Sequence, residues 1–252
     1  MIAPLSMAGA LMGGVVGAVV GSFAATAALR MARGEQALRG SSHCDGCDAP
    51  LSLLQATPLI SFVQRRGRCP ACKAGIDLAH PIGEAVGLLL GAACFGLLPP
   101  VTAVFAFAIG QLCLFISVYD LRTKLIPDLA TVGVFLASAG LCYRLGRTAF
   151  LPTLIATALV LVFASAVSLL TSRIIGRRAI GSGDLRLIAA LVPWCGLDSG
   201  LALAGAAGLG LLGFLVRPPQ DGRLPFAPCI ALAFWAVGFA RTLAPAAMGA
   251  GA

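Results

Sequence analysis

The chain alternates between long apolar runs and short polar gaps, and this pattern predicts membrane-spanning helices. A span needs roughly 20 apolar residues. We count about eight runs, near 4–29, two within 85–119, then 129–143, 148–172, 187–197, 199–216 and 224–243. Pro99 and Pro100 divide the 85–119 stretch, because adjacent prolines favour a turn over a continuous helix. The pattern predicts an all-α polytopic membrane protein with about eight transmembrane helices.

One long hydrophilic segment, from Arg30 to His80, interrupts the apolar runs. We therefore expect three parts: a first transmembrane span at 1–30, a polar loop at 31–80 and a membrane helical bundle at 81–252. Residues 1–29 carry no charged side chain, and Arg30 follows them. A signal peptide carries its positive charge before the apolar run. The first run is therefore interpreted as a retained span.

Composition also indicates a lipid-exposed chain, because 59% of the residues are apolar and only 11% are charged. The net charge is +8, but the basic residues gather in the gaps between runs. We therefore expect the lipid bilayer as a partner, and no nucleic acid. With the N-terminus outside, the inner gaps carry most of these charges, and the outer gaps carry only Arg144, Arg147 and Arg241. This bias places the 31–80 loop in the cytoplasm.

Four of the nine cysteines form two C-x-x-C pairs in the polar loop: Cys44 with Cys47, and Cys69 with Cys72. Two such turns can present four thiolates in a tetrahedron, which suits zinc. Disulfides are disfavoured, because cytoplasmic thiols stay reduced. We expect a structural zinc that holds this loop together. The other cysteines lie in apolar runs, where they behave as small hydrophobic side chains.

Four acidic residues adjoin apolar runs, where an ionised carboxylate is costly and therefore a functional candidate: Glu84, Asp120, Asp128 and Asp184. Asp120 ends the third span and Asp184 opens the sixth, so the predicted topology places both at the cytoplasmic level. Two adjacent carboxylates can share one proton and activate water, as in aspartic proteases. The spacing alone leaves two alternatives open: helix capping, and a proton-coupled transporter that uses the same residues.

Several motifs resemble those of the prepilin peptidases, the type IV leader peptidases of the GxGD membrane aspartyl protease class. The first half is similar in Gly21-Ser22-Phe23, both cysteine pairs, Pro58-Leu59-Ile60-Ser61, and Pro81 with Glu84. The second half is similar in Asp120 with Ile126-Pro127-Asp128, in Gly181-Ser182-Gly183-Asp184, and in Leu224-Pro225-Phe226-Ala227-Pro228. The resemblance covers roughly residues 20–245. GxGD alone is a weak signal, but all of these motifs in this order are specific.

The resemblance implies a multi-pass enzyme of the bacterial inner membrane. It would remove the basic leader peptide from type IV prepilins, or from pseudopilins of type II secretion, on the cytoplasmic side. The implied catalytic pair is Asp120 and Asp184, with Asp128 the second choice for the first position, since Asp128 has a capping role available.

Many members of this family also methylate the new N-terminus with S-adenosylmethionine. The chain departs from the family in the part linked to methyl transfer, where Ala25 replaces an Asn and Ser41 an Arg. The role of Glu84 stays open between a structural hydrogen-bond partner and a part of that site. Besides the transporter, we consider a membrane scaffold whose zinc loop docks a partner.

Overall fold

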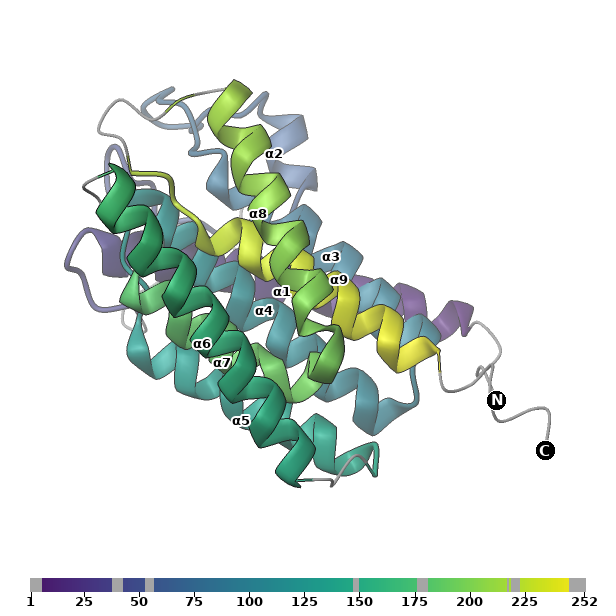
Figure 1. Ribbon diagram of the computed structural model, residues 1–252. Coiled ribbons are helices and arrows are strands. Elements are labelled where there is room, and N and C mark those ends of the chain that lie inside the picture. Colours follow the sequence, from purple (N-terminus) through teal and green to yellow (C-terminus); the bar gives the residue numbers. More distant parts are fainter. Residues whose placement is uncertain are drawn as a thin grey trace.

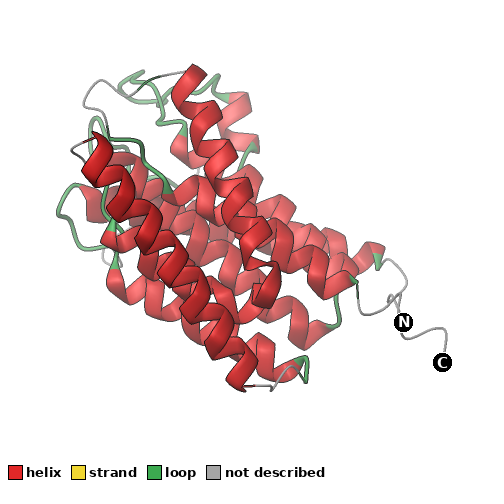
Figure 2. Cartoon of the chain, viewed as in Figure 1, coloured by secondary structure: helices red, strands yellow, loops and turns green. Residues whose placement is uncertain are grey.

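The computed structural model describes residues 6–37, 43–52, 57–146, 150–175, 181–216, 218 and 223–244. These residues form helices and loops, and no strand occurs among them (Figure 2). The elements are α1 (Met7–Ala32), α2 (Ile60–Gln64), α3 (Ala79–Leu97), α4 (Pro100–Thr123), α5 (Asp128–Arg144), α6 (Phe150–Ile175), α7 (Ser182–Cys195), the 3-10 turn η1 (Gly196–Asp198), α8 (Ser199–Val216) and α9 (Ala227–Leu243). The predicted all-α architecture is therefore confirmed for the described part of the chain.

Four segments are long and apolar enough to cross a membrane: Met7–Ala32, Ala79–Leu97, Pro100–Thr123 and Ser182–Val216. The last of these includes α7, η1 and α8. Shorter apolar stretches, Thr157–Leu170 and Ala227–Leu243, lie in α6 and α9. By length and composition, several helices of this protein can therefore cross a membrane.

The helices follow the predicted apolar runs, with differences at their ends. The turn at the proline pair is confirmed, because α3 ends at Leu97 and α4 begins at Pro100. Two helices reach further into the polar loop than the apolar pattern indicated. α1 continues through a buried Arg30, and α3 begins at Ala79, so that Glu84 is buried inside a helix. Local polar contacts described below explain how these charged residues stay in helices.

Four helices, α4, α5, α7 and α9, enclose the main hydrophobic core, and α1 and α3 pack beside α4 (Figure 1). Large side chains such as Ile109, Leu191, Trp194 and Phe234 are fully buried in this core. α6 packs on α7 and α8 packs on α9, while α6 and α8 make few contacts with each other. Both therefore lie on the outside of the bundle, in front in Figure 1.

The two ends of the bundle differ in chemistry. We call the end that carries residues 43–76 the loop end, and the opposite end the far end. The C-termini of α1, α4 and α6 and the N-termini of α3, α7 and α9 lie at the loop end, because consecutive long helices run antiparallel. An ion pair of 2.6 Å between Arg122 and Asp77 ties α4 to the loop there. At the far end, the Ser6 N–H donates to the Gly96 carbonyl.

Most described basic residues lie at the loop end, and Arg144 and Arg241 lie at the far end. This distribution agrees with the predicted orientation. Five other basic residues of the polar gaps lie outside the described residues: Arg39, Arg147, Arg177, Arg178 and Arg217.

Candidate functional site

Asp120 lies in the last turn of α4 and is buried, with 4% of its surface exposed. Its carboxylate accepts a hydrogen bond of 3.0 Å from the backbone N–H of Ala227. That N–H belongs to the first turn of α9, where helix N–H groups have no partner within the helix. The helix N-terminus therefore helps to hold a buried negative charge at this position.

Asp184 lies in the first turn of α7, after the Gly181-Ser182-Gly183 segment. Its carboxylate accepts a 2.9 Å hydrogen bond from the Gly181 N–H, so it does cap the helix. Gly183 lies against Ile126, because a Cβ there would come within 3.1 Å of the Ile126 Cβ. The small residues thus let the start of α7 approach the segment that follows α4. Capping uses one carboxylate oxygen and does not exclude a chemical role for the other.

Asp120 and Asp184 line the same cavity, which has a volume of about 1540 Å³. The cavity lies among α4, α6, α7, α8 and the segment that precedes α9, and Lys124 and Arg223 also line it at the loop end. Two aspartates from different helices thus line one cavity at the loop end. Two carboxylates facing one partly enclosed space can differ in protonation.

The other acidic candidates lie elsewhere. Asp128 is the first residue of α5, and its largely exposed carboxylate forms an ion pair with Arg186 of α7. It is not among the residues that line the cavity. Asp198 lies at the far end and pairs with Arg241 at 3.5 Å. Geometry thus favours Asp120 over Asp128 as the partner of Asp184. Asp221 lies outside the described residues.

The four predicted cysteines, Cys44, Cys47, Cys69 and Cys72, converge, with their sulfur atoms all within 4.8 Å of one another. Tetrahedral Zn–S bonds of about 2.3 Å give sulfur–sulfur edges of about 3.8 Å. The Cys44 and Cys72 Sγ atoms are 3.8 Å apart. The cluster can therefore hold a metal ion, and its size and thiolate chemistry fit zinc.

The two cysteine turns are built alike, which explains how they converge. In the first, the Cys44 N–H donates to the Ala49 carbonyl and its own carbonyl accepts from the Asp48 N–H. Cys69 makes the equivalent bonds with Ala74 and Lys73 in the second. Asp48 and Lys73 both have positive φ, 54° and 62°, a conformation that costs roughly 1–2 kcal/mol for a residue with a side chain. Both turns thus adopt an unfavourable backbone conformation that brings their cysteines into position as metal ligands.

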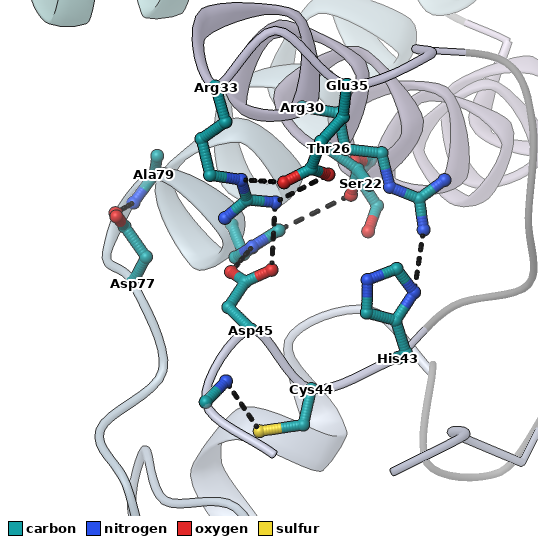
Figure 3. Close-up of polar contacts among 12 residues, drawn as sticks. Ser22, Thr26, Arg30, Arg33, Glu35, His43, Cys44, Asp45, Asp77 and Ala79 are labelled. Atoms are coloured by element: carbon teal, nitrogen blue, oxygen red, sulfur yellow. Dashed lines mark hydrogen bonds and ion pairs between the residues drawn. The ribbon is translucent and has the colours of Figure 1, made fainter. Parts of the chain in front are cut away.

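A charged network connects the first cysteine turn to α1 (Figure 3). Arg33 pairs with Glu35 at 2.8 Å and with Asp45 at 3.0 Å, and the Arg30 guanidinium lies 3.2 Å from His43 Nδ1. A hydrogen bond with His80 and the interaction with Arg33 hold the pKa of the Asp45 carboxyl below its usual value. Asp45 therefore stays ionised at neutral pH and links the loop to both α1 and α3.

Glu84 connects three segments that are distant in the sequence. Its carboxylate accepts hydrogen bonds from Ser22 Oγ of α1, at 2.8 Å, and from the Leu59 N–H of the loop, at 2.7 Å. Leu59 has φ +60° and ψ −48°, and the Ile60 N–H donates across it to the Pro58 carbonyl, which defines a strained γ-turn. Glu84 therefore makes the structural hydrogen bonds that one of its two predicted roles requires. The link to Ser22 could not be predicted from the sequence pattern.

These features define a class of protein: a multi-pass helical membrane protein with a tetracysteine loop and two aspartates sharing a cavity at the same end. Two family models match the chain, the bacterial peptidase A24 N-terminal domain at residues 15–97 and the type IV leader peptidase family at residues 105–237. The chain belongs to the type IV leader peptidase family. It is a multi-pass protein of the bacterial inner membrane.

Curated relatives carry the name prepilin leader peptidase/N-methyltransferase. One from Burkholderia pseudomallei (strain 1026b) is 33% identical over 80% of this chain and 66% of its own length. Relatives from Aeromonas hydrophila and Stutzerimonas stutzeri are 32% and 31% identical over 77% of this chain, and over 69% and 70% of their own lengths. The chain thus spans about two thirds of the length of these relatives. No solved structure matches the chain significantly.

Proposed function

We propose that this chain is a membrane aspartyl endopeptidase that removes the basic leader peptide of type IV prepilins or type II secretion pseudopilins on the cytoplasmic side. The observation that carries the proposal is the shared cavity of Asp120 and Asp184 at the loop end. The family and the names of the relatives supply the substrate class.

The chemistry needs one ionised and one protonated carboxyl group. The ionised aspartate takes a proton from water, whose oxygen attacks the carbonyl carbon of the scissile peptide bond. The protonated aspartate donates its proton to the carbonyl oxygen. The tetrahedral intermediate then collapses, the C–N bond breaks, and the leaving amine receives the proton that was taken from water. A hydroxyl proton of the intermediate returns to the aspartate that had donated its own, which restores the pair. We expect the titration to belong to the pair and not to either residue alone.

The geometry argues against the proton-coupled carrier considered above. A carrier needs polar or titratable groups along a route through the membrane. The cavity reaches from the aspartates to Gly196 and Leu197 at the far end, but the lining residues of α6 and those of α8 beyond Gly200 are apolar. This lining offers no relay for protons.

The proposed function also requires a particular arrangement of the helices and the loop relative to the membrane. The eight long helices of the described chain, α1 and α3 to α9, would each span the bilayer, with the loop end in the cytoplasm. Residues 1–30 would serve as the first span, 31–80 as the cytoplasmic loop, and 81–252 as the bundle that carries the protease site. The four cysteines would bind structural zinc, which leaves no coordination position open for catalysis.

Among the described residues, the cavity of the N-terminal half is small for S-adenosylmethionine. A cavity of about 140 Å³ between the loop, α1 and α3 contains the buried Arg30 and Glu84, but small-molecule sites usually occupy about 300–1,000 Å³. Ala25, at the position of the family's Asn, is fully buried beside Gly83. Ser41 lies outside the described residues. We therefore derive no methyl-transfer step. A mass spectrum of the cleaved product, formed with the cofactor present, measures that activity directly.

The proposal is tested by cleavage of purified prepilin in membranes that contain each variant. Asp120→Asn and Asp184→Asn should each reduce the cleavage rate by about 10³-fold or more, because each removes one of the two proton-transfer groups. Asp128→Asn is the matched control, since Asp128 lies at the same end but outside the cavity, and it should cleave at nearly the wild-type rate. All three proteins should insert to the same level. Wild-type cleavage by either of the first two variants would refute the assignment of that residue.

A further inference from the structure

The large cavity extends well beyond the two aspartates, as a groove between α6 and α8. α6 contacts η1 at the far end but makes few contacts with α8 (Figure 1). The groove residues of α8 run from Gly200 to Phe214. At about 1.5 Å per residue, this lining is about 21 Å long, which is most of the depth of a bilayer core. A groove of this length is too long for a compact small molecule.

Each wall of the groove is one continuous face of a helix. The α6 wall includes Leu159, Phe163 and Val167, spaced by four residues, and the α8 wall includes Ala204, Ala207 and Leu211, spaced by three and four. Such spacing places side chains on one helix face. All six are exposed and apolar within the described structure, so the groove has an unfilled hydrophobic lining. Small residues on α8 also allow another helix to approach closely.

The groove is continuous with the candidate protease site at its loop end. A peptide bond held between Asp120 and Asp184 has two flanking segments, and the groove offers one of them a path along α6 and α8. That segment cannot be the basic leader, because charged side chains are costly at membrane depth and the groove offers them no partner. It must be apolar, and its backbone must satisfy its own hydrogen bonds, which in lipid requires a helix.

We propose that the groove between α6 and α8 seats an apolar membrane-spanning helix of the substrate, on the side of the scissile bond opposite the leader. This inference rests on the proposed function, because it takes the two aspartates as the position of the cut. The enzyme would then recognise its substrate by a helix along the groove, in addition to residues near the bond. The helix would fix the scissile bond at the loop end, since its apolar length sets its depth.

Photo-crosslinking tests the seat without depending on cleavage. A photoreactive phenylalanine analogue would replace either Leu211 or Leu212. These neighbouring side chains are equally exposed, at 60% and 59%, but only Leu211 lines the groove. Phe163 and Val162 of α6 form a second such pair, at 61% and 67%. The probe substrate is the cleavage-site sequence of the prepilin followed by a designed helix of about 20 Leu and Ala residues. We expect crosslinks from positions 211 and 163, and at least about tenfold fewer from 212 and 162. Equal crosslinks within each pair, or none from any position, would overturn the proposal.

Cleavage kinetics provide the second readout in the full chain. Ala207→Trp fills the groove and should raise KM for the Leu/Ala substrate at least about tenfold, whereas Gly208→Trp, which faces open space outside the groove, should leave KM within about twofold. A substrate with a Gly/Ser tail should be cleaved equally by both variants. An unchanged KM in Ala207→Trp would reject the groove as the seat. If no substrate is cleaved by the wild type, the proposed function fails, while the crosslinks still decide whether the groove binds a helix.

Discussion

At the scale of single residues, the polar groups near the membrane are held by partners from distant parts of the chain. Asp120 is paired with a backbone N–H of α9, and Glu84 with groups from α1 and the loop. Burial without such partners would cost several kcal/mol for an ionised group. The structure therefore accounts for each buried carboxylate before any chemistry is assigned to it.

Glu84→Ala should destabilise the N-terminal part of the protein. The change leaves the Leu59 N–H and the Ser22 hydroxyl without their acceptor, which costs about 1–3 kcal/mol. Thermal unfolding in detergent should show a lower midpoint. The control is Glu35→Ala, whose exposed ion pair with Arg33 is worth at most about 1 kcal/mol. Equal midpoints for the two variants would contradict the structural role of Glu84.

At the scale of elements, α1 and α3 approach each other through glycines. Gly13, Gly17 and Gly21 of α1 face Gly83, Gly87 and Gly91 of α3, and an added Cβ at most of these positions would overlap backbone atoms of the opposite helix. Small residues at four-residue spacing let helices pack closely in a membrane, where dispersion rather than hydrophobic burial drives association.

Gly17→Ala should destabilise the protein and Gly14→Ala should not, although the two positions differ by less than one turn. A Cβ at Gly17 would collide with the carbonyl of Gly87, whereas a Cβ at Gly14 would make ordinary contact with Ala92 at 3.6 Å. We expect Gly17→Ala to lower stability by about 1–3 kcal/mol, because overpacking shifts the backbones apart. Gly14→Ala should be neutral or stabilising by up to about 1 kcal/mol, because alanine favours the helix. Denaturation of both variants in detergent measures the difference, and equal losses would argue against this packing.

At the scale of the whole molecule, the loop and the bundle have different sources of stability. In the described parts of the loop, 43–52 and 57–76, Cys69 is the only buried hydrophobic residue. The bundle has an extensive apolar core among α4, α5, α7 and α9. Metal binding should therefore matter for the loop and much less for the helices.

Removal of zinc with a strong chelator should unfold the loop while the helices persist. Purified protein should contain about one zinc per chain, and Cys44→Ser should lose it, because three thiolates hold zinc less tightly than four. Trypsin should then cut faster after the exposed Arg66 and Arg68, while the helical circular dichroism signal stays nearly constant. Cys94→Ala, a buried cysteine of α3 outside the cluster, should keep its metal. Metal-free wild-type protein would disprove the site.

The sequence by itself determined the features that depend on local spacing. Apolar runs of helix length, the proline pair at 99–100 and the two C-x-x-C turns each act within a few residues, so their pattern predicts the helices and the metal cluster directly. The same pattern predicted that Asp120 and Asp184 lie at one end of the bundle, since the expected direction of each helix follows from the number of spans before it.

The tertiary structure alone decided which of these elements meet. Ala227 reaches Asp120 only because α9 begins beside the end of α4, and Glu84 reaches Leu59 only because the loop folds back against the first turns of α3. The groove beside the aspartates exists because α6 packs on α7, α8 packs on α9, and the two hardly touch. Such contacts depend on packing between helices that are far apart in the sequence. The apolar pattern shows that each helix can lie in lipid, but it does not show which other helices that helix contacts.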